Sequence, residues 1–517
     1  MDIHMTTDPS SLPPRRTRVL VIGGGPGGSM AAILLAREGM EVTLLERDQF
    51  PRYHIGESLL TSAIPVLKFV GLYERMEAHG FVRKHGGYFT LKEGAPPGHI
   101  DFRKVSVHQH SYQVIRSEFD HLLLQYAAEM GAQVFERTAV TGVDFEGDRP
   151  VRARWQQQGG SSGELEFEYV IDASGLSGLL STKVLHNRKF QPAFANVAVG
   201  SYWKGYDEYV APDGTPQEGR FFMEALRDGS GWIWAIPLHD GTMSVGVVMH
   251  TDEFQRLRTA LPTEGAEGGA DVEAIYRHGI DKAPHLRNML AKAEMTKPVQ
   301  TWRDYSYIAD TFSGPGYRLV GDAAAFIDPL FSTGVHLAFL GAVSAAASIA
   351  GRLRGELDED AAIGFHDRCI RKAYVNFAII VSGMYKQIRR QDEVVLYGIA
   401  QTDFRAAFDV ILPLISGSAD LEGDAVDPNT IDRAVSFAIE MVNERAQLGT
   451  ENPAARLLVK KGSVHEDLTA EPDQAVGGWY IRMERGRLGL AQVVEQEKID
   501  KEKQQLTNEL LEVAQSS

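Results

Sequence analysis

The sequence is poor in cysteine and carries fewer basic than acidic residues. Cys369 is the single cysteine, which excludes a disulfide framework and argues against a cysteine-based metal site. The chain has 53 Lys and Arg residues against 69 Asp and Glu residues, which gives a net charge of −16. This balance argues against nucleic acid and against anionic membrane surfaces as partners, because both repel an acidic protein.

Long runs of large apolar side chains are also missing. The stretch most similar to a membrane span, Pro329 to Gly351, holds no acidic or basic residue, but it is rich in Ala, Gly and Ser. These small residues give little transfer free energy, so we expect a buried helix and no membrane span. A single thiol fits a reducing compartment, and the predicted location is therefore cytoplasmic.

A glycine fingerprint opens the chain. Gly23, Gly25 and Gly28 form a G-x-G-x-x-G motif between the apolar run Thr17 to Gly23 and a helical segment. Gly23 permits a tight turn, Gly25 lets the backbone approach a pyrophosphate, and Gly28 allows the helix to pack closely on the strand. Glu46 ends the next predicted strand, near the expected ribose hydroxyls of an adenosine. The motif predicts a bound ADP moiety at a helix N-terminus, and the alternative is a plain glycine turn in an α/β domain.

Three distant segments bear on the identity of the dinucleotide. Arg116 precedes a helical segment, Asp172-Ala173-Ser174-Gly175 follows a buried strand, and Gly321-Asp322 follows another. They resemble segments that return to the flavin in flavoprotein monooxygenases and halogenases. The resemblance implies FAD, with Asp322 near its ribityl and pyrophosphate groups. Two other interpretations stay open, namely Arg116 as a surface charge and Asp322 as a helix N-cap.

Three further motifs are unusual for a flavoprotein. Trp232 and Trp234 alternate along a predicted strand, so their side chains share one face. Phe326 to Gly334 reads F-I-D-P-L-F-S-T-G and leads into the uncharged helical run. Lys84 follows the first predicted flavin loop and precedes Gly86-Gly87. Taken alone, the tryptophans fit a buried aromatic pair and the lysine fits a solvated surface charge.

Together with the glycine fingerprint, these motifs resemble the flavin-dependent halogenases, in particular the branch that halogenates phenols in polyketide pathways. The resemblance covers roughly residues 17 to 380. It implies an α/β protein with a GR2-type FAD-binding domain, Rossmann-like and similar to flavoprotein monooxygenases, an inserted antiparallel sheet and a helical C-terminal region. We therefore expect a discontinuous FAD-binding domain at 17–82, 113–182 and 300–355, a substrate-side β-sheet region at 83–112 and 183–299, and the helical region at 356–517.

The same resemblance implies roles for individual residues. Lys84 is implied to be the catalytic lysine, and the backbone amides of Thr333 and Gly334 are implied to bind chloride, which suits amides at a helix start. The implied cofactor-binding residues are Gly23, Gly25, Gly28, Glu46, Arg52, Ser58, Arg116, Asp322 and Gly334. The residues implied to form a barrier and tunnel between flavin and substrate are Trp232, Trp234, Ile236, Pro237 and Phe331. Phe331 stands where the tryptophan-halogenating branch carries glutamate, which favours an electron-rich phenol that needs less activation.

The implied reaction uses FADH2, O2 and chloride, with bromide as the alternative halide. A flavin peroxide oxidises the halide to hypohalous acid, which passes to Lys84 and halogenates a small phenolic substrate. No second dinucleotide fingerprint is evident, so the expected partner is a separate NAD(P)H-dependent flavin reductase. The substrate is free or carrier-bound, and the acidic charge favours a free one. His54, His85 and His110 are candidate bases for the phenol, although we expect a structural role for each.

Other functions are compatible with a related fold. An FAD-dependent aromatic hydroxylase would transfer oxygen directly and would be reduced by NADPH in the presence of its substrate. A prenyl-lipid reductase would need a long apolar tunnel and no oxygen chemistry. A non-catalytic escort protein is disfavoured, because the cofactor segments are intact.

Overall fold

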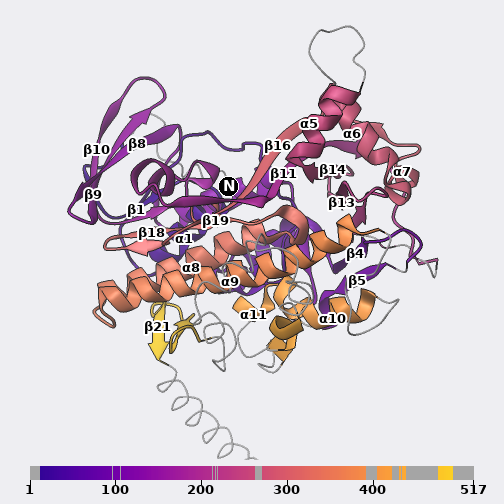
Figure 1. The fold of residues 1–517 in the computed structure, drawn as a ribbon. Helices are drawn as coiled ribbons and strands as arrows, with labels where there is room; N and C mark the ends of the chain where they lie inside the picture. Colours follow the sequence, from indigo (N-terminus) through magenta and orange to yellow (C-terminus); the bar gives the residue numbers. More distant parts are fainter. Residues whose placement is uncertain are drawn as a thin grey trace, which may run out of the picture.

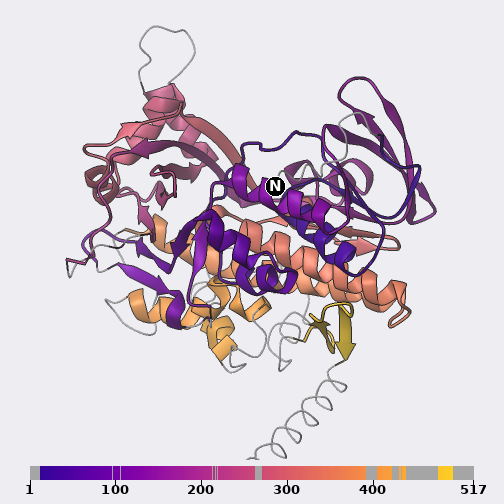
Figure 2. The same ribbon diagram turned by 180° about the vertical axis from the view of Figure 1, so that it is seen from behind.

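The computed structural model describes residues 12–95, 97–104, 106, 108–211, 214–215, 217, 219–261, 271–391, 404–421, 430–431, 433–437 and 475–492. Two large sheets, two separate strand pairs and a layer of long helices make up this part of the chain (Figure 1). Figure 2 shows from behind that the N-terminal helices, coloured indigo to purple, lie in front of the long helices. The predicted class, α/β, is confirmed.

The first sheet is built around the N-terminal strand β1. Its strands lie in the order β17 (Ser313–Gly314), β18 (Tyr317–Leu319), β10 (Ser162–Asp172), β1 (Arg16–Ile22), β2 (Val42–Leu45) and β7 (Gln133–Phe135). In addition, β9 (Arg149–Gln157) pairs with β10, and β8 (Thr138–Glu146) pairs with β9. β1 pairs in parallel with β2 and β10, and β18 pairs in parallel with β10. All four residues of β2 are buried, as is usual for a parallel strand with both faces covered. The carboxyl ends of β1, β2, β10 and β18 therefore meet at one edge, where the glycine loop begins.

The second sheet is mostly antiparallel. Its strands lie in the order β19 (Ala325–Phe326), β16 (Gln300–Ala309), β11 (Arg188–Lys204), β14 (Met243–His250), β13 (Gly231–Pro237), β12 (Phe221–Ala225), β4 (Gly86–Thr90) and β5 (Gly98–Asp101), with β15 (Glu294–Met295) beside β11. The long pairing of β16 with β11 puts residues 300–309 in this sheet. These residues, which the expected division assigns to the FAD-binding domain, thus pair with the second sheet, and the domain boundary itself stays a prediction.

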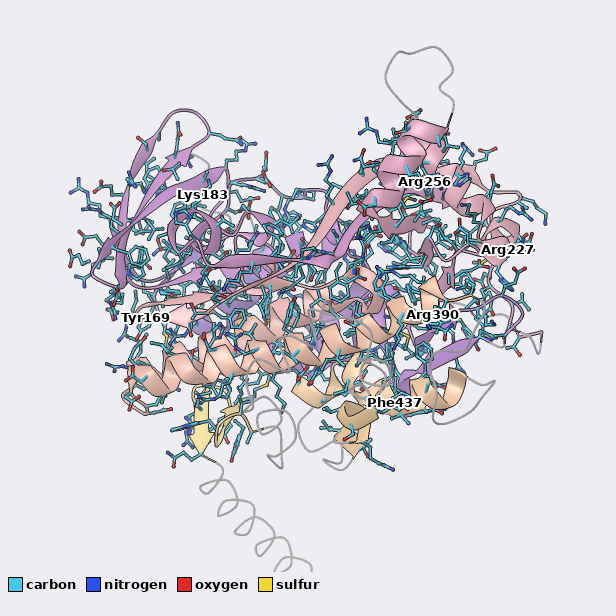
Figure 3. The ribbon with its side chains drawn as sticks, in the orientation of Figure 1. Tyr169, Lys183, Arg227, Arg256, Arg390 and Phe437 are labelled. Atoms are coloured by element: carbon cyan, nitrogen blue, oxygen red, sulfur yellow. The ribbon has the colours of Figure 1, made fainter. Side chains whose placement is uncertain are left out.

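Strand β13 separates two hydrophobic cores. Trp232, Trp234 and Ile236 belong to the large core shared with the first sheet and the long helices. Ile233 and Ala235 belong to a second core under α5 (Thr251–Ala260), α6 (Val272–Asp281) and α7 (Pro284–Met289). Side chains alternate between the two faces of a strand, so both faces of β13 are covered. Charged residues such as Arg227 and Arg256 lie on the outside of this helical layer (Figure 3).

Four long helices complete the large core. They are α1 (Pro26–Arg37), α4 (Arg116–Glu129), α8 (Thr333–Leu353) and α9 (Glu359–Arg389). α8 packs against α1 and α9, and α8 and α9 run across the molecule below the first sheet in the view of Figure 1. α8 is the one described helix long and apolar enough to cross a membrane, but 94% of its apolar window is buried inside the protein. The expectation of a buried helix in Pro329 to Gly351 is confirmed.

The C-terminal region is less uniform than its sequence predicts. It contains the helices α10 (Phe404–Ile415) and α11 (Ser418–Leu421), and then a strand pair, β20 (Trp479–Arg482) with β21 (Gly489–Gln492). The strand pair lies against α8, which the purely helical expectation missed. Residues 438–474 and 493–517 of the predicted helical region lie outside the described residues.

Candidate active site

The glycine turn between β1 and α1 has the shape that a dinucleotide requires. Gly23 has a positive φ of 101°, and a Cβ atom on Gly28 would lie 1.9 Å from the Gly23 carbonyl oxygen. Gly25 is the extended N-cap residue of α1, and within the described chain no side chain caps this helix. The amides of the first turn therefore face the glycine loop without an internal acceptor, which suits a diphosphate.

Glu46, directly after β2, closes one side of this turn. Its Oε2 accepts a hydrogen bond from the Gly24 N–H at 2.5 Å, and its Oε1 accepts one from the Asp48 N–H at 2.8 Å. The side chain is buried, and burial raises the pKa of its carboxyl group. Its place at the loop agrees with the expected ribose contact, which stays a prediction.

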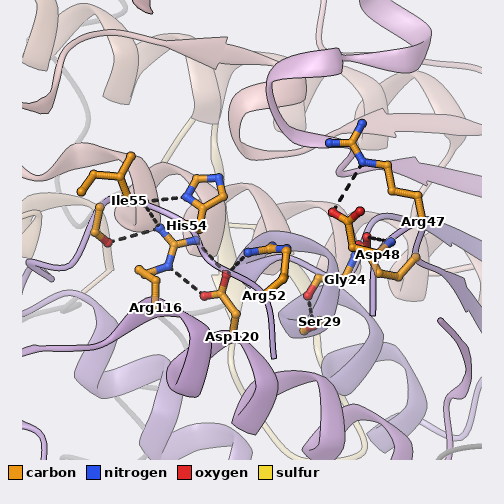
Figure 4. Close-up of polar contacts among 11 residues, drawn as sticks. Gly24, Ser29, Arg47, Asp48, Arg52, His54, Ile55, Arg116 and Asp120 are labelled. Atoms are coloured by element: carbon orange, nitrogen blue, oxygen red, sulfur yellow. Dashed lines mark hydrogen bonds and ion pairs between the residues drawn. The ribbon is translucent and has the colours of Figure 1, made fainter. Parts of the chain in front are cut away.

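Two predicted cofactor residues, Arg52 and Arg116, share the carboxylate of Asp120 (Figure 4). Arg116 Nε lies 2.8 Å from Asp120 Oδ1, and Arg52 Nη1 lies 3.0 Å from Oδ2. Arg116 also donates to the Ile55 carbonyl at 2.7 Å. A Cβ on Gly25 would lie 3.5 Å from Arg52 Nη2, so this guanidinium reaches the glycine loop. Arg116 is only 6% exposed, which rules out the interpretation as a surface charge.

Asp322 follows β18 in the short turn Gly321–Ala323. Its backbone carbonyl accepts hydrogen bonds from Tyr307 Oη at 2.7 Å and from Arg188 Nη2 at 3.1 Å, which fix the turn. Desolvation raises the pKa of the Asp322 carboxyl to about 6, while Arg116 and Arg188 act in the opposite direction. Asp322 and Arg116 are thus close enough to interact, although they come from opposite parts of the flavin half.

The segment before α8 is held in a fixed shape by its own residues. Asp328 Oδ1 accepts the Leu330 N–H at 3.0 Å, Ser332 has a left-handed φ of 59°, and Thr333 Oγ1 donates to the Asp328 carbonyl at 3.3 Å. Thr333 and Gly334 begin α8. A Cβ on Gly334 would meet no heavy atom within 4 Å, so there is open space beside this helix start. Helix amides beside open space can receive an anion.

The two tryptophans of β13 lie on one face, as their spacing predicts. Their ring centroids are 6.1 Å apart, and both side chains are buried. Trp232 Nε1 donates to Tyr385 Oη at 2.8 Å, and Trp234 Nε1 donates to Ser244 Oγ at 3.2 Å. Pro237 ends the strand and is partly exposed. Each buried indole N–H thus has an acceptor, which fixes the orientation of both rings.

A polar network ties this strand to the segment before α8. Tyr385 Oη, from α9, donates to Asp328 Oδ2 at 2.9 Å. Asn196 Nδ2, from β11, lies 2.9 Å from the same oxygen and 2.8 Å from Tyr385 Oη. Burial raises the pKa of Asp328 to about 6, and hydrogen bonds from the Leu330 amide, Tyr385 and Asn196 oppose this shift. No sequence motif predicts this network, because its members are far apart along the chain.

Lys84 ends the short strand β3 (Val82–Lys84), which pairs with β6 (Ser111–Gln113). The side chain is 4% exposed, and Nζ donates to the Leu59 carbonyl at 3.0 Å. The rings of Phe102 and Phe221 are neighbours of the amine, with centroids 5.3 and 5.6 Å from Nζ. Burial lowers the pKa of the amine to about 7. The surface-lysine interpretation is therefore wrong, and a large fraction of the amine is neutral near pH 7.

A run of phenylalanine rings joins Lys84 to the segment before α8. Phe331 lies 5.7 Å from Phe89, and Phe89 lies 5.4 Å from Phe221, which flanks Lys84. Phe408 from α10 adds a fourth ring, 4.8 Å from Phe89. The predicted barrier residue Phe331 is thus part of an aromatic cluster between the helix start and the lysine, and α10 from the C-terminal region helps to build it.

The three candidate histidine bases each bond a backbone carbonyl. His54 Nδ1 lies 2.6 Å from the Ile55 oxygen, His85 Nδ1 lies 3.2 Å from the Gln109 oxygen, and His110 Nδ1 lies 2.7 Å from the His108 oxygen. Burial lowers the pKa of His54 to about 4 and also lowers that of His110. These contacts favour the structural role that the sequence predicted for them.

The described chain contains one group of three potential metal ligands. His79 Nε2 and His239 Nε2 lie 2.7 and 3.1 Å from the same oxygen of Glu118. A hydrogen bond from His79 and an ion-pair contact from His239 to one carboxylate oxygen account for this arrangement. The group joins the last residue of α3 (Tyr73–His79), the first turn of α4 and the turn after β13.

Comparisons with known proteins agree with this geometry. Residues 16–203 match a family described as FAD binding domain. Flavin-dependent halogenase armH3 of Armillaria mellea is 39% identical, over 92% of this chain and 98% of that protein. Sulochrin halogenase gedL of Aspergillus terreus is 37% identical, over 92% of this chain and 93% of that protein. The solved structure of the myxobacterial chondrochloren halogenase CndH is 30% identical with a TM-score of 0.65, and covers 83% of this chain and 97% of that one.

The residues around the glycine turn fit FAD. The turn leaves room for a diphosphate at the start of α1, and the two arginines supply positive charge beside it. The matches extend over nearly the whole chain, including α8 and the tryptophan strand. The chain therefore belongs to the flavin-dependent halogenases, enzymes that use FAD.

Proposed function

We propose that this enzyme chlorinates, or brominates, an electron-rich phenolic substrate with the amine of Lys84 as the group that delivers the halogen. The observation that carries the proposal is the burial of Lys84 between two aromatic rings, with a pKa lowered to about 7. Burial of a lysine amine costs free energy because it removes the charged form from water, and such burial is uncommon unless the neutral amine has a chemical use.

FAD is held in this proposal by the glycine turn, Glu46, Arg52, Arg116 and Asp322, with Gly334 as a further contact. Ser58, which the resemblance implies as a cofactor contact, lies opposite Gln113 of β6, the strand that pairs with β3 and Lys84. In its reduced form it reacts with O2 and supplies the two-electron oxidation that converts halide to hypohalous acid. The chain shows a single glycine fingerprint, so reduced FAD is expected from a separate NAD(P)H-dependent flavin reductase. A cytoplasmic location is part of the proposal, since the reductase draws on NAD(P)H.

The halide binds at the start of α8, to the amides of Thr333 and Gly334. Three features of this helix start support the assignment: the open space beside Gly334, the fixed turn at Ser332 and the absence of acidic residues from the first helical turn of α8 as described. Backbone amides do not distinguish chloride from bromide by charge, so both halides fit.

The substrate is kept away from the site of oxidation by a wall of apolar side chains. Trp232, Trp234, Ile236, Pro237 and Phe331 form this wall in the proposal. Burial and the fixed indole orientations support it, because rigid rings exclude both water and substrate. Small hypohalous acid passes the wall, whereas an aromatic ring does not.

At Lys84 the neutral amine either hydrogen-bonds the hypohalous acid or exchanges with it. In the exchange, the nitrogen takes the halogen and the N–H proton leaves with hydroxide as water. The phenol ring then attacks the halogen, the nitrogen lone pair returns, and the ring loses its proton. The exchange needs an uncharged amine with a free lone pair on Nζ, which the lowered pKa provides near pH 7. A free phenol is favoured over one on a carrier protein, because the chain has a net charge of −16.

The test supplies chemically reduced FAD, O2, chloride or bromide, and a panel of phenols to the purified enzyme. We expect mass spectra with the halogen isotope pattern and a mass gain of one halogen for one hydrogen. Hydroxylated products without halogen would instead identify an aromatic hydroxylase and overturn the proposal. A parallel sample with NADPH and no reductase should give no product, because the enzyme is not expected to reduce its own FAD.

A further inference from the structure

We propose that Ser111 and Gln113 of β6, together with Ser58, complete a binding site at Lys84 for a ligand O–H group. This inference rests on the proposed function in one respect, namely that the halogen is transferred to the substrate at Lys84. The ligand chemistry is a hydroxyl whose oxygen accepts from Lys84 and whose hydrogen is donated to one of these oxygens. Hypohalous acid and a phenolic hydroxyl share this chemistry.

The four side chains lie on one face of three neighbouring extended segments. β3 pairs with β6 so that Lys84 is directly opposite Ser111, and β6 pairs on its other side with Ser58 opposite Gln113. Directly opposed residues in an antiparallel pair point to the same side, and so do residues two apart in a strand. Lys84, Ser111, Gln113 and Ser58 therefore share one face.

The contact made by the amine puts Nζ above this face. Lys84 starts on β3 and donates to the carbonyl of Leu59, which lies beyond β6. Strands lie about 4.8 Å apart, so the side chain has to cross β6 at the level of Ser111 and Gln113 to reach that carbonyl. This contact occupies one N–H, and the remaining hydrogens or the lone pair of the amine face the neighbouring groups.

Ser58 and Gln113 are brought especially close. The Leu59 N–H donates to the Tyr112 carbonyl at 2.9 Å, and the Val114 N–H donates to the Glu57 carbonyl at 2.7 Å. These two hydrogen bonds flank the pair of Ser58 and Gln113, which is therefore a non-hydrogen-bonded pair. In such pairs the Cα atoms are about 4.5 Å apart and the side chains approach most closely.

Three polar atoms on this face have no hydrogen-bond partner within the part of the chain that the structure describes. They are Ser58 Oγ, Ser111 Oγ and Gln113 Oε1, and the exposed fractions of these residues are 6%, 0% and 0%. Gln113 Nε2 reaches the Gly219 carbonyl at 3.5 Å, which leaves its oxygen for another donor. A buried polar atom without a partner is costly, and three of them beside one buried amine indicate a ligand.

The surroundings of the amine select for a neutral hydroxyl. Phe102 and Phe221 flank Nζ, and burial is the cause of the lowered pKa of Lys84. Ser111 and Gln113 are uncharged, so they hold a hydroxyl without competing for the proton of the amine. Either ligand, once held, stands with its oxygen toward the lysine, and the rings of Phe102 and Phe221 are its apolar neighbours.

The experiment compares Ser111→Ala and Gln113→Met with Thr43→Val. Thr43 Oγ1 is likewise fully buried without a partner in the described chain, but Thr43 lies in β2, away from Lys84. The first measurement is the dissociation constant of the phenol from the test panel that binds the wild type most tightly, on enzyme loaded with oxidised FAD and without turnover. The second is the share of hypohalous acid that escapes to an added 1,3-diketone trap, per reduced FAD consumed.

Loss of one hydrogen bond corresponds to about a five- to tenfold effect. Weaker phenol binding by that factor in both variants, with unchanged escape of oxidant, identifies the phenolic hydroxyl as the ligand. Unchanged phenol binding with a similar increase in escaped oxidant identifies hypohalous acid. Thr43→Val should match the wild type in both measurements. If both variants also match the wild type, the inference is overturned, and the three atoms bind only solvent.

The two proposals fail in different ways. If the wild type gives no organohalide, the proposed function fails, whereas the effect of Ser111→Ala on phenol binding is still measurable. Thermal melting guards against misfolding, since removal of an unpaired buried hydroxyl in Ser111→Ala and Thr43→Val should leave the melting temperature unchanged or higher, whereas Gln113→Met also loses the contact of Nε2 with the Gly219 carbonyl. A lowered melting temperature of Ser111→Ala, with no such change in Thr43→Val, would mean that the Ser111 hydroxyl is structural and would also overturn the inference.

Discussion

Replacing Lys84 by methionine should stabilise the protein while it removes halogenation. The pKa of this amine falls from the ordinary 10.5 to about 7 through burial. A lysine with a lowered folded pKa costs nothing above pH 10.5, where it is neutral in both states; its cost grows as the pH falls from 10.5 to about 7 and is constant below that. At about 1.4 kcal/mol per pH unit, the cost is about 5 kcal/mol at pH 6 and about 3 kcal/mol at pH 8.

Methionine matches the length of the lysine stem, but it loses the hydrogen bond to the Leu59 carbonyl. The loss of this hydrogen bond reduces the gain in stability by about 1 kcal/mol, and the loss of the contacts between the amine and the two rings reduces it by a similar amount. The net gain in the free energy of unfolding is therefore about 3 kcal/mol at pH 6 and decreases toward pH 10. Urea unfolding of the FAD-loaded protein at pH 6, 8 and 10 measures it.

Lys92→Met is the matched control, because Lys92 Nζ also donates to a backbone carbonyl, that of Gln391, but the residue is partly exposed. This control should change stability little, and equally at all three pH values. The reasoning is refuted if Lys84→Met destabilises the protein at pH 6, or if the gain is independent of pH. Either result would mean that the lysine is a charged structural residue.

Three other predictions concern the rest of the site. Gly28→Ala should abolish FAD binding, because its Cβ would lie 1.9 Å from the Gly23 carbonyl oxygen, and loss of flavin absorbance after gel filtration measures this. Gly334→Ala should fold normally, because a Cβ there meets no heavy atom within 4 Å, but it should raise the KM for halide. Tyr385→Phe removes the acceptor of the Trp232 N–H and should lower the unfolding free energy by about 2 kcal/mol and raise the halide KM, both measurable on one preparation. Burial raises the pKa of Glu57 from 4.5 to about 7, so its ionisation costs stability as the pH rises through this range. Glu57→Gln should therefore gain about 3 kcal/mol relative to the wild type between pH 4.5 and 8 in urea unfolding.

Local patterns in the sequence predicted the elements that depend on neighbouring residues. The glycine fingerprint defined the turn between β1 and α1, and the alternation of Trp232 and Trp234 predicted their common face. The small residues of α8 predicted a buried helix, since they allow close approach of α1 and α9. In each case the periodicity of one segment determines which side chains are buried.

Contacts between distant segments were not predictable in this way. Asp120 holds both arginines of the flavin half, yet its spacing to Arg116 alone reads as an ordinary helical ion pair. The hydrogen bond of Tyr385 to Trp232 joins residues 153 apart. Likewise, only the pairing of β3 with β6 shows that Ser111 lies opposite Lys84. Sheet partners and register depend on the whole fold, so one strand pattern does not specify them.

The coupling between oxidation and halogenation tests the central claim most directly. The measurement counts halogenated phenol formed per reduced FAD consumed, for the wild type, Lys84→Met and Lys92→Met under O2 and saturating chloride. We predict that all three consume reduced FAD at similar rates, that the wild type and Lys92→Met yield organohalide, and that Lys84→Met yields none while hypohalous acid escapes to the trap. Halogenated phenol from Lys84→Met at the yield of the wild type would contradict the account.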